Sequence, residues 1–135
     1  KGHAAAYARA IALAQLERLG LASRAADLAG SFAYGDRRRL EIARALALEP
    51  RFLLLDEPAG GLNHEEVHVL GDLIRRIRDD RHMTVLLVEH HMGLVMSIAD
   101  HVVALNFGRK LAEGTPAQVQ ADPDVIKAYL GSKDQ

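Results

Sequence analysis

The chain has 135 residues, a length that suits one modest domain, and 49% of them are hydrophobic, which is enough to build a core and excludes intrinsic disorder. Seventeen basic and eighteen acidic residues leave a formal net charge of -1, which excludes a strong general attraction to nucleic acid or anionic lipid. There is no cysteine, which excludes disulfides and thiolate metal sites and fits the cytosol. Aromatic residues are only 4%, which favours helices packed on a sheet over an aromatic-rich barrel.

Neither a membrane span nor a signal peptide is expected. No apolar run approaches the roughly 20 residues that cross a bilayer, and charged residues interrupt the alanine-rich start. The first residue is Lys1 rather than Met, so we expect a piece of a longer protein.

The first half of the chain predicts two helices before a strand. Residues 4–19 have the apolar spacing of a helix that ends at Gly20, and residues 21–30 are a weaker helical or loop segment. Residues 36–48 give a strong helical pattern, which Pro50 ends because proline forbids the helix from continuing.

A short apolar strand follows at residues 52–55, and its length suits a strand buried on both faces of a parallel sheet. Asp56 and Glu57 come at its carboxyl end, the edge where open parallel sheets bind ligands. Since side chains alternate along a strand, one acid could hold a hard cation such as Mg²⁺ while the other takes a proton from water. For the dipeptide alone, a solvated acidic turn is the alternative.

The second half alternates helices with strands. Asn63 is predicted to cap a helix that runs through residue 78, with Glu66 at the capping-box position. Two further helices are predicted to open at Thr115-Pro116 and Asp122-Pro123. Between the helix that runs through residue 78 and the one that opens at Thr115, we predict four elements. They are a strand at residues 84–88, a short helix at 92–99, and a strand at 101–105 with its hairpin partner at 109–113. This alternation predicts an α/β layer with a mostly parallel sheet.

The helix that follows Gly35 has a feature of phosphate sites. Glycine permits a tight entry, and the first amides, from Gly35 and Asp36 onward, lack partners within the helix. Such a helix end carries about half a positive charge and binds phosphate. An ordinary glycine-started helix with a basic exposed turn is the alternative.

Residues 32–46, FAYGDRRRLEIARAL, resemble the signature motif and following helix of ATP-binding-cassette (ABC) ATPases. Downstream, FLLLDEP resembles the Walker B strand, AGGLN resembles the D-loop, and VEH resembles the strand end that carries the switch histidine. Several motifs in the right order over essentially the whole chain make this resemblance specific. AYGDRRRLEIARAL, LLVEHHMGLVMSIAD and AEGTPAQVQADPDVIKAYLG are similar to the ATPase subunit of branched-chain amino acid importers.

The resemblance implies a partial P-loop NTPase (RecA-like) α/β core with a mostly parallel sheet flanked by helices. Residues 1–30 would be the end of an ABC helical subdomain, residues 31–113 the C-terminal part of the ATPase core, and residues 114–135 the C-terminal helices.

The resemblance also implies roles for single residues. Asp56 would bind Mg²⁺ through its water, Glu57 would polarise the attacking water, and His90 would reach the γ-phosphate of ATP. The signature residues Ala33, Tyr34, Gly35 and Asp36 would cap the γ-phosphate of ATP held by a second subunit. The glycines of the D-loop, residues 59–63, would allow close backbone contact across that dimer, and Asn63 would both serve there and cap a helix.

The sequence departs from the family pattern at two of these positions and at His91. The commonest signature has serine where this chain has Ala33 and glycine where it has Tyr34. Ala33 cannot make the charge-assisted hydrogen bond of the serine, worth roughly 1.5–3 kcal/mol, so backbone amides must bind the phosphate. His91 stands where the subfamily commonly has aspartate. We expect it to be a tolerated exposed residue rather than a metal ligand, because consecutive side chains point apart and no further ligands converge in sequence.

The chain contains no GxxxxGK[ST], so the phosphate-cradling loop, the adenine-stacking aromatic and the Q-loop glutamine are expected upstream of Lys1. Phosphoryl transfer needs that cradle. The 135 residues alone are therefore expected neither to bind ATP tightly nor to hydrolyse it, and open sheet edges make self-association a possibility.

The resemblance implies an ATPase subunit of an ABC importer, for branched-chain or related amino acids. It would lie peripherally on the cytoplasmic face of the membrane and pair head to tail with a second ATPase subunit. Its other partners would be permease subunits and, indirectly, a substrate-binding protein, with no nucleic acid. The alternatives are a lipopolysaccharide-export ATPase and, from another class, a catalytically silent ABC-like interaction module, against which intact Asp56, Glu57 and His90 argue.

Overall fold

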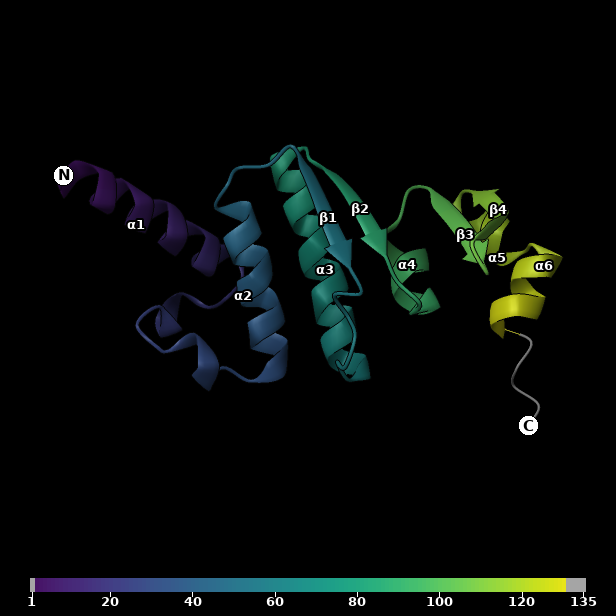
Figure 1. Cartoon of the computed structure of the whole chain (residues 1–135), viewed down its shortest axis with the longest axis horizontal. Helices are drawn as coiled ribbons and strands as arrows, with labels where there is room; N and C mark the ends of the chain where they lie inside the picture. The colour runs from purple at the N-terminus through teal and green to yellow at the C-terminus, as the bar shows by residue number, and fades with distance from the viewer. Residues whose placement is uncertain (1, 131–135) are drawn as a thin grey trace. The chain divides into compact units, whose positions relative to one another are not determined.

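A computed structural model of the chain describes residues 2–130 (Figure 1). The chain divides into two compact units, one up to Val88 and one from Glu89 onward, and each contains helices and a two-stranded sheet. Within the described residues, no helix is both long enough and apolar enough to cross a membrane.

The first unit opens with helix α1, Gly2–Arg18, which ends where Gly20 adopts a φ of 72°. Two short 3₁₀ turns, η1 at Ala22–Arg24 and η2 at Ala29–Ser31, lie in and next to residues 21–30, which were predicted to be a weaker helical or loop segment. Helix α2, Tyr34–Leu46, follows and buries the side chains Ile42, Ala43 and Leu46. The predicted helices at 4–19 and 36–48 are confirmed, with shifts of two residues or fewer at their ends.

Strand β1, Phe52–Asp56, pairs in parallel with β2, Thr84–Val88, and the helix α3, His64–Arg81, connects them. The register runs from Phe52 opposite Thr84 to Asp56 opposite Val88. This is the βαβ unit that the alternation of strands and helices predicted.

The expectation that β1 is buried on both faces is wrong for the described chain. Leu53 is 6% exposed, whereas Phe52 and Leu54 are 52% and 65% exposed. On β2, Leu86 and Val88 are 52% and 53% exposed, and the in-register pairing places them on the same face as Leu54 and Asp56. One face of the parallel pair is therefore apolar and open.

Helix α3 is fixed at both ends by local chemistry. The Asn63 side chain accepts from the Glu66 amide and the Glu66 side chain accepts from the Asn63 amide, both at 2.9 Å, which confirms the predicted capping box. At the other end His82 adopts the left-handed conformation with a φ of 48°. Arg81 then reaches back to α1, because its Nη2 donates to the Oε1 of Gln15, a buried amide, at 2.8 Å.

The second unit is built on an antiparallel hairpin. Strands β3, Val102–Asn106, and β4, Arg109–Gly114, join through Phe107 and Gly108, whose φ values are both positive, as a tight hairpin turn requires. Helices α4, Met92–Ile98, α5, Pro116–Gln120, and α6, Pro123–Val125, complete it with a π-helical turn η3 at Ile126–Leu130. Its core consists of Val102, Ala104, Val119 and Val125, against which Met92, Val95, Met96, Ala99, Leu111 and Ala112 pack.

Candidate functional site

The two acids that the sequence singled out lie at the carboxyl end of β1. Asp56 is the last strand residue and is exposed. Glu57 follows with a φ of 44°, and its amide donates to the carbonyl of Val88 at 2.8 Å. The bond extends the β1–β2 ladder by one step while the left-handed residue turns the chain away from the sheet. A non-glycine residue in this region costs of order 1–3 kcal/mol and is typical of functional sites.

The loop after Glu57 is closed by its own backbone. The Gly60 amide donates to the Glu57 carbonyl and the Leu62 amide to the Ala59 carbonyl, each at 3.1 Å, and Ala59 is fully buried. Gly61 has a φ of 77°, a conformation that glycine adopts without steric cost. Asn63 ends the loop as the N-cap of α3, so its side-chain oxygen is already bonded to the Glu66 amide.

The signature segment starts α2, but the helix begins at Tyr34 and not at the predicted entry through Gly35. Ala33 is the N-cap and forms no side-chain capping bond, and the Arg37 amide donates to the Ala33 carbonyl at 2.9 Å. The amides of the three preceding residues, Tyr34, Gly35 and Asp36, have no carbonyl four residues earlier inside the helix. They form the kind of helix end that binds phosphate through backbone alone.

Tyr34 joins this helix end to the loop after β1. A Cβ built on Gly61 would lie 3.0 Å from Cε1 of the Tyr34 ring, so ring and loop backbone are in contact. The Tyr34 hydroxyl accepts from Arg38 Nη2 at 2.7 Å, and the guanidinium of Arg38 lies 5.1 Å from the ring centroid. Hydrogen bonds to Glu41 and then to Tyr34 raise the pKa of Arg38 above its ordinary value. No sequence pattern predicts the contact of Tyr34 with Gly61, because the two residues are 27 positions apart in the chain.

Gly35 makes a second contact of α2, with the loop after β1 and the first turn of α3. A Cβ at this position would lie 3.0 Å from Oε1 of Glu66 and 3.7 Å from Cδ2 of Leu62. A larger residue would press on the glutamate that completes the capping box. The turn role predicted for Gly35 is wrong, because α2 begins at Tyr34 and Gly35 is not among the glycines with a positive φ; its role is one of packing.

The Asp36 side chain is occupied by arginines. Its Oδ2 lies 3.4 Å from Arg24 Nη1 and its Oδ1 lies 3.3 Å from Arg39 Nη2. The Arg24 guanidinium also lies 3.9 Å from the centroid of the buried Phe32 ring. These ion pairs occupy the Asp36 carboxylate, so only its backbone amide remains for the predicted anion binding.

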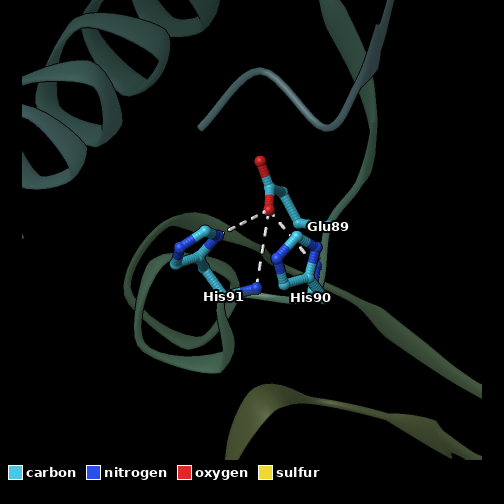
Figure 2. Close-up of side chains that lie close together, drawn as sticks. All are labelled: Glu89, His90 and His91. Atoms are coloured by element: carbon cyan, nitrogen blue, oxygen red, sulfur yellow. Dashed lines mark hydrogen bonds and ion pairs between the residues drawn. The ribbon is translucent and has the colours of Figure 1, made fainter. Parts of the chain in front are cut away.

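The predicted switch histidine, His90, belongs to the second unit and follows β2 directly. It lies beside Glu89 and His91, as Figure 2 shows. The Glu89 side chain is fully buried, and its Oε2 accepts from the amides of His90 and His91 at 3.2 and 3.4 Å and lies 3.1 Å from His91 Nδ1. The His90 and His91 rings lie 4.6 Å apart between centroids.

The expectation for His91 is therefore wrong in its geometry. Consecutive side chains point apart in an extended strand, but β2 ends at Val88 and the chain turns around the Glu89 carboxylate. That turn places both imidazoles on one side, with Glu89 as the converging third group. His91 is also only partly exposed.

The structure thus distributes the predicted residues over the two units. In the first, Tyr34, Gly35 and Asn63 lie close together around Gly61 and Glu66, and Asp56 and Glu57 end β1. In the second, His90 is held beside Glu89. As a carboxylate at a strand end, Asp56 offers the oxygen donor that Mg²⁺ prefers.

Comparisons with known proteins place the chain among ATP-binding cassettes. Residues 5–60 match the family described as ABC transporter, and residues 109–135 match the one described as branched-chain amino acid ATP-binding cassette transporter. The chain is 55% identical over 116 residues to the high-affinity branched-chain amino acid transport ATP-binding protein BraF of Pseudomonas aeruginosa, which covers 86% of this chain and 46% of BraF. The chain thus spans about half the length of such relatives.

Two further comparisons bear on fold and on the alternative export function. The crystal structure of MJ1267, an ATP-binding cassette of an ABC transporter in its ADP conformation, superposes with a TM-score of 0.80 at 29% identity, over 90% of this chain and 49% of that one. The lipopolysaccharide export system ATP-binding protein LptB of Acidithiobacillus ferridurans is 41% identical over 105 residues, 78% of this chain and 43% of LptB.

Proposed function

The chain belongs to the ABC ATPase family, and from this premise we propose that it is the signature-to-switch portion of the ATP-hydrolysing subunit of an importer for branched-chain or related amino acids. The observation that carries the proposal is the end of the parallel pair β1–β2. Asp56 and Glu57 end one strand, and the neighbouring strand leads directly to Glu89 and His90. Two acids at the end of β1, together with a histidine that follows β2 in the sequence, are residue types that hydrolysis of a bound nucleotide requires.

Each group has a role that its chemistry supports. Glu57 accepts a proton from the attacking water, and its backbone is held at the end of β1 by the bond to the Val88 carbonyl. Asp56 holds Mg²⁺, an ion that neutralises charge on the phosphates when bound. His90 donates to the γ-phosphate as an imidazole on an exposed turn.

The start of α2 acts on a different nucleotide. We assign the amides of Tyr34, Gly35 and Asp36 to the γ-phosphate of ATP bound by a second ATPase subunit, with the Gly61 loop at the same dimer interface. The contact of Tyr34 with Gly61 supports this, because it ties the two elements that would meet the partner. On this proposal the subunit lies at the cytoplasmic face of the membrane and drives permease subunits supplied by a binding protein. The segment boundaries at residues 30 and 113 are part of the same proposal.

The importer assignment rests on relative similarity. The chain is 55% identical to BraF and 41% identical to LptB, and residues 109–135 match the branched-chain family. A silent interaction module has no physical need for Asp56, Glu57 and His90 together, and all three are present.

The test is an exchange of segments. Since the chain has no GxxxxGK[ST], its aligned 116 residues are built into BraF in place of that protein's own, and a matched chimera is made with LptB. We expect the BraF chimera to restore leucine uptake in cells that lack BraF and the LptB chimera to fail in lipopolysaccharide export. Failure of uptake by a folded BraF chimera, or function in export alone, would contradict the importer assignment.

A further inference from the structure

We propose that Glu89, His90 and His91 form a binding site for a transition-metal ion such as Zn²⁺ at the end of β2. Each of the three offers a ligand atom, and these atoms all lie within 4.8 Å of one another (Figure 2). Within residues 2–130, no other group of three His, Cys, Asp or Glu side chains meets this spacing.

The buried carboxylate organises the site. Glu89 is fixed by the amides of His90 and His91, so its position does not depend on a metal. Glu89 Oε2 and His91 Nδ1 already lie 3.1 Å apart, the separation of two ligands on one ion, so a bound metal would take the place of the proton between these two atoms.

The second imidazole is already close. The His90 and His91 rings lie 4.6 Å apart with a tilt of 33°, His90 is exposed, and the His91 side chain is 36% exposed, so an ion from solvent can reach both. Metal–ligand bonds of about 2.0–2.2 Å set neighbouring ligand atoms roughly 3–4 Å apart. Rotation of the two rings that shifts their nitrogens by about 1 Å therefore completes the site.

The donor set selects the class of ion. Two imidazoles with a carboxylate suit Zn²⁺, Cu²⁺ or Ni²⁺, whereas Mg²⁺ and Ca²⁺ prefer oxygen ligands. The ion would therefore differ from the one assigned to Asp56. If the proposed function holds, metal at this site would occupy His90 and slow hydrolysis, but binding itself does not depend on that function.

A competing pair of histidines sets the control. His64 and His68 lie one turn apart on α3, both exposed, with ring centroids 4.6 Å apart. They offer two ligands without a third. Any metal titration of the whole chain must separate this pair from the Glu89–His91 site.

The experiment is a calorimetric Zn²⁺ titration of the untagged chain with Mg²⁺ in large excess. We expect His91→Gln to weaken binding by at least about tenfold, and the double substitution His64→Gln with His68→Gln to leave the tighter site intact. Equal affinity of the His91→Gln variant, or loss of binding only in the α3 variant, would overturn the proposal, as would absence of binding by the wild-type chain.

A measurement on the unaltered chain guards against variants that do not fold. Substoichiometric Cu²⁺ broadens NMR signals near the ion. We expect the strongest broadening at the amides of residues 89–91 in the ¹⁵N-labelled chain. Broadening centred on His64 and His68 instead would overturn the proposal.

Discussion

Ala33, at the start of α2, occupies an N-cap position without a capping side chain. Its φ of −60° and ψ of 159° suit a capping serine, whose hydroxyl would accept an amide of the first turn. We predict that Ala33→Ser raises the free energy of unfolding by about 1 kcal/mol, measured by urea denaturation followed by circular dichroism. Ala12→Ser, on the exposed middle of α1, is the control and should lower stability slightly, because serine is a weaker helix former. An unchanged or lower stability for Ala33→Ser would contradict the assignment of Ala33 as the N-cap of α2.

Gly61 combines a φ of 77° with close contact to the Tyr34 ring. A methyl group there would meet both the left-handed strain and an aromatic ring 3.0 Å away. We predict that Gly61→Ala lowers the free energy of unfolding by at least about 1–2 kcal/mol. The matched control is Gly93→Ala in α4, where a Cβ meets nothing within 4 Å and the change should be neutral or stabilising. Equal effects of the two substitutions would refute the Tyr34–Gly61 contact.

At the scale of elements, the capping box of α3 connects a site residue to stability. Replacing Asn63 by alanine removes the acceptor for the Glu66 amide. We predict a loss of about 1 kcal/mol for Asn63→Ala and only a few tenths for Asn63→Gly. Urea denaturation of both variants tests this, and an equal loss in the two would mean that the cap is not what Asn63 contributes.

The β3–β4 hairpin contains an irregularity that brings two charges together. The register shifts between Ala104 and Leu105, so Lys110 and Glu113, three residues apart, face each other instead of lying on opposite faces. Lys110 Nζ lies 2.6 Å from Glu113 Oε2, and His101 Nε2 lies 3.1 Å from Oε1. The hydrogen bond from Lys110, and then that from His101, lower the pKa of Glu113 below its ordinary value of 4.5.

The lowered pKa of Glu113 makes the stability of the fold depend on pH. A carboxyl with a lowered folded pKa stabilises the fold above its unfolded value, and that contribution is lost as the pH falls through the folded pKa. We predict that Lys110→Gln returns the pKa of Glu113 toward 4.5, read by NMR titration of the carboxyl carbon, whereas Lys127→Gln leaves it unchanged. Because the pair is exposed, salt should weaken the effect. If the pKa of Glu113 in the Lys110→Gln variant equals that in the unsubstituted chain, the hydrogen bond from Lys110 is not what lowers it.

The elements that the sequence predicted well are those fixed by local chemistry. The Asn63–Glu66 spacing predicted a capping box, Thr115-Pro116 predicted the start of α5, and residues 84–88 match β2. The contact of Tyr34 with Gly61 and the open face of β1 could not be predicted, because they depend on which distant segments meet. The convergence of His90 and His91 depends on a turn around Glu89, and the alternation of side chains along a strand does not describe a turn.

At the scale of the whole molecule, the parallel pair β1–β2 exposes an apolar face that includes Leu54, Leu86 and Val88. Two strands alone are marginally stable, and contiguous apolar surface of this kind marks an interaction site. The chain spans 46% of BraF, and we propose that the remaining half of such a subunit covers this face. The BraF chimera supplies that half, so it is the protein in which catalysis by these residues can be measured.

The most direct test of the catalytic role of Glu57 is to measure ATP hydrolysis by the purified BraF chimera that carries Glu57→Gln. The control is the same chimera with Glu65→Gln, which changes an exposed acid outside the site. Losing a general base typically slows turnover by about 10²–10⁴-fold. We predict that loss for Glu57→Gln, with ATP still bound, and unchanged turnover for Glu65→Gln. Undiminished hydrolysis by the Glu57→Gln chimera would contradict the claim that this chain carries the catalytic carboxylate of an ABC ATPase.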